Sequence, residues 1–204
     1  MIKAGRILMV TAMVTALAAF TPPSETVEIG DPIPLAHVQM TNIDGATTML
    51  RSEMKMNGLL VIFSCNTCPF VLQWENRYNP IFELCEKNDV GMVLVTSNEA
   101  KRDGDDSMAK MNEKAESEGY KMKYLMDKDH VVADAFGART TPHVYLFNKH
   151  AKLAYRGSID DNSENPEEVS ETYLMDAINN MVLDEPIDPN ITKSIGCSIK
   201  RIAK

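Results

Sequence analysis

The sequence predicts an α/β fold with a mixed central sheet flanked by helices. Two continuous apolar runs, residues 58–63 and 90–96, have the length and composition of buried strands, and a helical pattern separates them. A polar helical stretch, a β-hairpin and a last helix follow this βαβ unit. With 204 residues, the chain is long enough for one well-buried domain.

The first 20 residues differ in composition from the rest of the chain. Lys3 and Arg6 precede an apolar segment, residues 7–20, that is short for a membrane-spanning helix and ends in small residues. We therefore interpret residues 1–20 as a secretory signal peptide, with an uncleaved membrane anchor as the alternative. Cleavage would leave an exported, periplasmic or extracytoplasmic protein that is not an integral membrane protein.

The mature chain is acidic. The formal net charge of the whole sequence is −8, and it becomes −10 once Lys3 and Arg6 are removed with the signal. Such a charge disfavours binding to nucleic acid or to an anionic membrane surface. By composition, residues 21–32 form a linker and residues 33–204 form the domain, which includes a cysteine-containing tail.

Two cysteines, Cys65 and Cys68, follow the first buried strand directly, with Pro69 next. Pro69 suits the first turn of a helix, and the residues able to cap that helix are Ser64, Asn66 and Thr67. The unpaired N–H groups and positive dipole end of the helix would stabilise a thiolate over a thiol. Cysteines at this spacing can also close a disulfide. A zinc site would need a second ligand pair, and Cys85 and Cys197 are isolated.

The remaining elements are predicted from periodicity and turn signals. Apolar residues at spacings of three and four mark a helix over residues 70–85, with Cys85 in the core and a kink at Pro80. Acidic residues 160–164 are expected to form a solvated turn. The other expected elements are a hairpin over 36–49 turning at Asp44 and Gly45, a helix from about 107 to Gly119, a strand over 124–126, a helix over 129–136, a hairpin over 144–156, and a last helix opened by Asn165 and Pro166.

This order of elements, with a Cys-x-x-Cys motif at the first βα turn, resembles thioredoxin. The chain looks like an exported thioredoxin-like redoxin of the broad group that also holds alkyl-hydroperoxide-reductase/thiol-specific-antioxidant (AhpC/TSA) proteins. The resemblance covers residues 33–204 and rests on two motifs, residues 65–70 and 140–147. It implies a thioredoxin-like fold with an N-terminal β-hairpin extension and a helical insertion before the second motif.

The second motif implies a substrate clamp. In thioredoxin folds a cis proline at the start of a strand lies against the dithiol, and Thr141 and Pro142 are the matching positions. The resemblance implies that the backbone of Thr141 binds a substrate chain. An ordinary strand-start proline is the alternative.

The chain departs from thioredoxin beside the dithiol. No Trp precedes Cys65, and residues 58–63 contain no acid to match the buried carboxylate of thioredoxins. The base that would activate Cys68 is therefore unassigned. Asn66 and Thr67 replace Gly-Pro, so the reduction potential of thioredoxin does not carry over.

A third cysteine, Cys197, lies in a C-terminal tail that resembles a terminal motif of one branch of these redoxins. Ile195, Cys197 and Ile199 alternate as in a strand, which predicts that all three point the same way and pack. Alternatively, Cys197 is a third redox thiol whose pKa is lowered by neighbouring basic residues.

Three functions fit these residues. In a thiol–disulfide oxidoreductase, Cys65 would be the exposed attacking thiolate and Cys68 the resolving thiol. In an AhpC/TSA-type antioxidant peroxidase, Cys68 would attack peroxide, Cys65 or Cys197 would resolve the sulfenic acid, and Arg139 would be the candidate for the arginine that peroxiredoxins place near the sulfur. A copper-delivery redoxin would add His143 to the cysteines.

Disulfide exchange is the principal prediction. Arg139 does not align cleanly with the peroxidase pattern, and the cysteine spacing is one residue short of the copper-chaperone motif. Disulfide exchange needs no cofactor and no resident metal, because the thiols carry out the chemistry. Its partners would be protein or small-molecule thiols and disulfides, together with an upstream electron donor.

Overall fold

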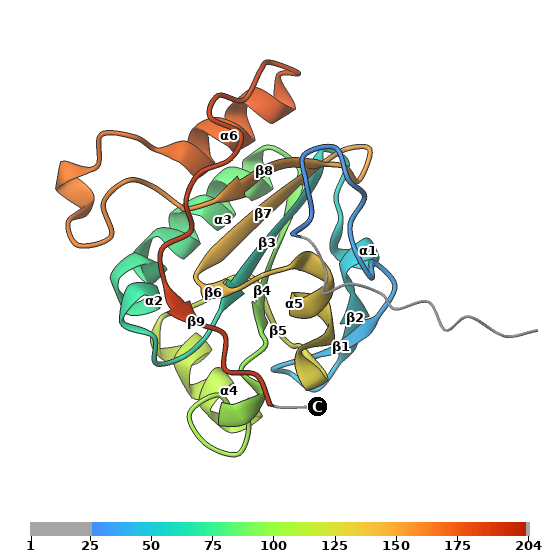
Figure 1. Cartoon of the computed structure of the whole chain (residues 1–204), viewed down its shortest axis with the longest axis vertical. Coiled ribbons are helices and arrows are strands. Elements are labelled where there is room, and N and C mark those ends of the chain that lie inside the picture. The colour runs from blue at the N-terminus through green and yellow to red at the C-terminus, as the bar shows by residue number, and fades with distance from the viewer. Residues whose placement is uncertain (1–25, 203–204) are drawn as a thin grey trace, which may run out of the picture.

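A seven-stranded mixed sheet lies at the centre of the computed structural model, which describes residues 26–202 (Figure 1). The predicted α/β architecture is therefore confirmed. The strands are β1 (Gln39–Asn42), β2 (Thr47–Met49), β3 (Gly58–Ser64), β4 (Val90–Thr96), β5 (Lys123–Met126), β6 (Thr140–Thr141), β7 (His143–Asn148), β8 (Leu153–Gly157) and β9 (Cys197–Ser198). The α-helices are α1 (Leu50–Glu53), α2 (Pro69–Trp74), α3 (Tyr78–Lys87), α4 (Met108–Ser117), α5 (Val131–Phe136) and α6 (Tyr173–Val182).

The strands follow the order β2-β1-β5-β4-β3-β7-β8 across the sheet. Strands β3, β4 and β5 run parallel, and β7, β8, β1 and β2 add antiparallel pairs on the two sides. The N-terminal hairpin turns where predicted, because Asp44 Oδ1 accepts the N–H of Ala46 at 2.8 Å and Gly45 has a φ of +82°. Strands β6 and β9 form a separate two-stranded sheet.

Strand β3 is buried on both faces, which holds its end in place. Leu60 and Ile62 pack in one core with α3, α4 and α6, whereas Val61 and Phe63 pack in a second core with α1 and α5. Successive side chains of a strand point to opposite faces, so the strand is packed into a separate core on each face of the sheet. The segment that follows Ser64 therefore begins from a rigid support.

The helix after β3 is broken, but not at Pro80. Helix α2 ends at Trp74, a 3-10 turn covers Glu75–Arg77, and α3 starts at Tyr78. Pro80 thus lies in the first turn of α3, where its missing N–H is not needed. A proline ring clashes with the carbonyl four residues earlier, here that of Asn76, which is why the break lies one turn before the proline.

The last helix starts later than predicted. Asn165 does cap Glu167, at 3.0 Å, but the helix it opens is only the 3-10 turn Pro166–Glu168. The N–H and hydroxyl of Ser170 then donate to the Asp161 carboxylate, as does the N–H of Glu171, and these bonds hold an extended segment before α6.

The acidic loop 160–164 is not simply solvated. Asp160 is only 5% exposed and accepts hydrogen bonds from Trp74 Nε1 at 2.6 Å and Arg77 Nε at 3.1 Å. The loop is therefore tied to the broken helix, because a buried carboxylate needs such partners.

The N-terminal part of the described chain is packed on the domain. Val27 is buried, the N–H of Gly30 donates to the Leu153 carbonyl at 2.8 Å, and the N–H of Leu153 donates to the Asp31 carbonyl at 2.8 Å. Of the predicted linker 21–32, residues 26–32 thus belong to the folded domain. The predicted signal peptide lies outside the described residues. Within residues 26–202, no helix is both long and apolar enough to cross a membrane.

Candidate functional site

The dithiol lies where β3 passes into α2. Cys68 is itself the N-cap residue of α2 and Pro69 is the first helical residue, so none of Ser64, Asn66 or Thr67 caps this helix. The sulfur of Cys68 is consequently held at the start of the helix, where backbone N–H groups have no intrahelical acceptor. Cys65 is 3% exposed and Cys68 is 5% exposed, so the expectation of an exposed Cys65 thiolate is wrong.

The segment carrying Thr141 and Pro142 lies against both sulfurs. The Thr141–Pro142 bond is cis, as predicted. Cys65 Sγ is 3.3 Å from the hydroxyl of Thr141, and Cys68 Sγ is 3.1 Å from the Thr141 carbonyl oxygen, to which it donates only while it is protonated. One residue therefore contacts both reactive atoms, which brings together all four residues expected at the dithiol and the clamp.

Hydrogen bonds shift the pKa values of Cys65 and Cys68 in opposite directions. The Cys65 thiol donates to Cys68, and Cys197 and the backbone N–H groups of Val71 and Cys197 add further hydrogen bonds, which together lower the pKa of Cys68 to about 4. The pKa of Cys65 is raised, because its proton is held by Cys68, its sulfur is buried, and the Asp106 carboxylate lies nearby. Negative charge in the pair thus resides on Cys68.

Asp106 is a site residue that the sequence analysis missed. Its side chain is fully buried, and its Oδ1 accepts the N–H of Asn66 at 2.8 Å, which holds the turn between the two cysteines. Asn98 Nδ2 donates to the other oxygen at 2.9 Å. Asp106 precedes α4 rather than lying on the strand before the dithiol, so its only sequence signal was its place beside a helix N-cap.

The edge of Thr141 that was expected to clamp a substrate chain is occupied by the chain's own tail. Strand β9 pairs antiparallel with β6, so that Thr141 lies opposite Cys197 and Thr140 opposite Ser198. Figure 1 shows β9 lying across β6, next to the start of α2. In this arrangement no second strand can pair with Thr141 on that side.

The tail does not pack as the alternation predicted. Ile199 is buried, Cys197 is half-buried and Ile195 is 45% exposed, so the three residues do not share one packed face. Strand β9 is only two residues long, and the chain leaves extended pairing at Gly196. Cys197 packs against the cluster formed by Cys65, Cys68 and Val71. Burial and the neighbouring Cys68 raise its pKa, so the alternative of a pKa lowered by basic residues is wrong.

A small cavity of about 100 Å³ gives access to the thiols. Cys65, Cys68 and Cys197 line it together with Lys101 and Lys200. These two lysines bring positive charge to the lining, and Lys101 is also paired with Asp105 at 3.6 Å. A space of this size admits a small molecule rather than a folded partner.

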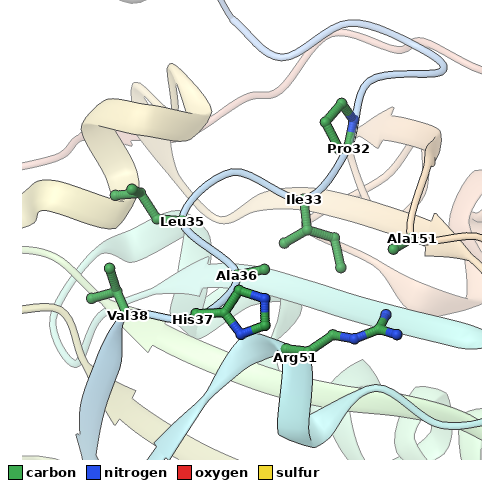
Figure 2. Close-up of a pocket in the computed structure, with 8 residues that line it drawn as sticks. All are labelled: Pro32, Ile33, Leu35, Ala36, His37, Val38, Arg51 and Ala151. Carbon is green, nitrogen blue, oxygen red and sulfur yellow. The ribbon is translucent and has the colours of Figure 1, made fainter.

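A larger hollow of about 740 Å³ lies elsewhere and contains no cysteine. Figure 2 shows its lining, which comes from the segment before β1, from α1 and from the β7–β8 turn. His37 and Arg51 are its only titratable residues. The small cavity is therefore the better candidate for redox chemistry.

The other predicted candidates lie outside the thiol cluster. Cys85 is fully buried, as expected of a core residue. His143 is buried with Nδ1 3.2 Å from the hydroxyl of Tyr145, and burial together with the charges of two arginines, one of them Arg139, lowers its pKa to about 4. Within the described residues, no group of three or more His, Cys, Asp or Glu side chains is arranged to hold a metal ion.

Comparison with known proteins places this arrangement in a family. The model of the Redoxin family matches residues 28–174. An uncharacterised conserved protein from Geobacillus kaustophilus is 30% identical with a TM-score of 0.80, over 89% of this chain and 96% of that one. A hypothetical protein from Sinorhizobium meliloti 1021 is 26% identical with a TM-score of 0.79, over 89% and 98%.

A more distant structure supports the fold alone. A thioredoxin-like protein in its oxidised form is 17% identical with a TM-score of 0.60, over 76% of this chain and 97% of that one. The thioredoxin-like fold is thereby confirmed. No curated protein matches the chain.

Proposed function

The chain belongs to the Redoxin family and is a thiol-based redox protein, and from this premise we propose that it is a thiol–disulfide oxidoreductase working through Cys65 and Cys68. The observation that carries the proposal is the contact of both sulfurs with Thr141, at 3.3 and 3.1 Å, beside a helix N-terminus. Two thiols held against the same residue and packed in one cluster can exchange a disulfide with a partner.

In the proposed mechanism Cys68 attacks first, which reverses the order in the principal prediction from sequence. Cys68 carries the negative charge, so its thiolate attacks a partner disulfide, forms a mixed disulfide and expels one partner thiolate. Cys65 then attacks the sulfur of Cys68 and expels the second partner thiolate. The Cys65 proton and one from solvent convert the two leaving groups to thiols, so one partner disulfide is reduced as Cys65–Cys68 is oxidised.

Peroxide reduction is the second candidate, favoured by the small cavity and by the lowered pKa of Cys68. Cys68 would attack one peroxide oxygen to give a sulfenic acid and release an alcohol or water, and Cys65 would close the disulfide with loss of water. The charge of Arg139, the candidate peroxidase arginine, affects the pKa values of His143 and Tyr145. Its position adds no support to this candidate.

The two candidates are separated in the Cys197→Ser protein, which keeps only the Cys65–Cys68 pair at the site. Treatment with oxidised glutathione should release two glutathione thiols per protein and leave a disulfide within tryptic peptide 56–77. If exchange is the function, peroxide should oxidise the pair much more slowly than oxidised glutathione does, as measured by the loss of free thiol. Rapid oxidation by peroxide, with no reaction toward oxidised glutathione, would replace exchange by peroxidase activity.

We also propose that the protein is exported and acts on thiol partners outside the cytosol. The support is the N-terminal segment, with Lys3 and Arg6 before the apolar residues 7–20. N-terminal sequencing of the protein recovered from periplasm or medium tests this. A mature N-terminus near residue 20 is expected, and recovery of the intact chain in the cytosol would contradict it.

A further inference from the structure

We propose that Cys197 is a third redox-active thiol that forms a disulfide with Cys68, so that the C-terminal strand acts as a built-in substrate segment for the dithiol. The proposal rests on the proposed function and deepens it, because it assigns a partner to Cys68 within the same chain. Four observations carry it: strand pairing, side-chain direction, close backbone approach and accessibility.

Strand pairing places Cys197 where a substrate cysteine would lie. Thr141 and Cys197 are direct partners in an antiparallel pair. An extended peptide that binds a sheet edge uses the same backbone hydrogen bonds. The tail therefore occupies the position of a substrate strand, and it brings a cysteine to the residue that contacts both catalytic sulfurs.

Side-chain direction turns the Cys197 sulfur toward Cys68. Directly opposed residues of an antiparallel pair project to the same face of the sheet. The Thr141 side chain contacts Cys65 Sγ, so the Cys197 side chain lies on the thiol side. Consistently, Cys197 packs against the cluster of Cys65 and Cys68 and lines the same cavity.

The backbone approach requires glycine next to Cys197. A Cβ at Gly196 would lie 2.2 Å from the Thr141 carbonyl oxygen and 3.2 Å from the nitrogen of Pro142. No other residue fits at this separation without moving the strand. Beyond the cysteine, the N–H of Lys200 donates to Asn98 Oδ1 at 2.8 Å and the N–H of Ile199 to the Arg139 carbonyl at 2.9 Å.

Accessibility favours Cys197 over Cys65 as the first thiol to reach a mixed disulfide at Cys68. Cys197 is half-buried and Cys65 is 3% exposed, and both pack in one cluster with Cys68. In the exchange, a mixed disulfide of Cys68 and a small thiol is attacked by the Cys197 sulfur, which expels the thiol and gives Cys68–Cys197. Cys65 then attacks Cys68 and releases Cys197, whose sulfur takes up the proton from Cys65.

Docking of the tail also defines the class of substrate. With β9 paired to β6, the thiols line a cavity of about 100 Å³ whose lining also includes Lys101 and Lys200. Small anionic thiols and their disulfides suit this space and charge. Polypeptide disulfides would have to displace β9 first.

The test uses the Cys65→Ser protein, in which the last step is blocked. Trypsin places Cys68 on residues 56–77, Cys85 on residues 78–87 and Cys197 on residues 194–200, so each pairing is read from non-reduced peptide masses. After oxidised glutathione, we expect peptides 56–77 and 194–200 to be joined and no glutathione to be retained. The Cys65→Ser/Cys197→Ser protein should instead retain one glutathione on Cys68.

Two further variants test whether Cys85 takes part in the exchange and whether β9 must be docked. The Cys65→Ser/Cys85→Ser protein should behave as Cys65→Ser alone. The Cys65→Ser/Gly196→Val protein keeps Cys197 but cannot seat β9, so it should retain glutathione on Cys68.

The inference is overturned if Cys65→Ser retains glutathione on Cys68 while Cys197 stays reduced, or if Cys68 does not react in that protein. Failure of the proposed function is separate. It would appear in the Cys197→Ser protein as the absence of a Cys65–Cys68 disulfide.

Discussion

Cys68 and Cys85 lie on the two halves of the same broken helix, and both are buried, yet they are opposite kinds of thiol. Burial and the charge of Glu86 raise the pKa of Cys85 to about 12. The pKa of Cys68 falls to about 4, because neighbouring thiols and backbone N–H groups donate to its sulfur. Burial alone makes a thiol inert, and the same burial with donors aimed at the sulfur stabilises a thiolate.

The largest expected effect comes from removing the thiolate. Cys68→Ser should reduce exchange with oxidised glutathione below detection, because neither Cys65 nor Cys197 has a lowered pKa. Thiol release measured over time gives the rate, with Cys85→Ala as the matched control. Retention of most of the rate in Cys68→Ser would show that Cys65 is the attacking sulfur.

The pH dependence of alkylation should distinguish Cys68 from Cys85. A group with a lowered pKa is ionised above that pKa, so Cys68 should react with iodoacetamide at a rate that is nearly constant from about pH 5 to about pH 8. Cys85 should remain unmodified there, because its raised pKa keeps it protonated. The rates are read from tryptic peptides 56–77 and 78–87. A tenfold rise per pH unit at Cys68 would contradict the assignment.

Asp106→Asn should weaken the support of the dithiol. The new amide would set an N–H donor against Asn98 or Asn66, each of which now donates to the carboxylate. We expect the free energy of unfolding to fall by about 1 to 3 kcal/mol, and the pKa of Cys65 to fall because a nearby negative charge is gone. Urea unfolding measures the first, and Asp105→Asn at the adjacent exposed position is the control. Equal effects of the two variants would refute the role of Asp106.

Cys85→Ala should have the smallest effect on chemistry. Exchange should be unchanged, since Cys85 lies in the core away from the cavity. Loss of the buried sulfur should lower the free energy of unfolding by about 1 to 2 kcal/mol, as for other small core deletions. Urea unfolding and thiol release on one sample test both. A loss of exchange at unchanged stability would make Cys85 part of the redox path.

Short sequence patterns correctly predicted the elements that depend on only a few neighbouring residues. The Asp44-Gly45 turn, the run of residues 58–63 and the first-turn proline after Cys68 each carry their signal within a few residues, and each is present. The broken helix was also predicted, with an error of one turn because the effect of Pro80 falls on the carbonyl of an earlier residue.

Contacts between distant segments could not be predicted in this way. Asp160 reads as part of an acidic surface turn until Trp74 and Arg77 are seen to donate to it. Asp106 lies 40 residues from Asn66, whose N–H it accepts, and no spacing rule links them. The pairing of Thr141 with Cys197 likewise depends on how the chain returns to the site.

Asn98 joins the tail to the support of the dithiol through a single side chain. Its oxygen accepts the N–H of Lys200, while its amide nitrogen donates to Asp106, which in turn holds the turn at Asn66. Release of the tail would therefore remove one of the hydrogen bonds that fix the Asn98 side chain, which also donates to Asp106. If docking of the tail changes the free energy of oxidising the dithiol, thermodynamic reciprocity requires that oxidation change the free energy of docking by the same amount.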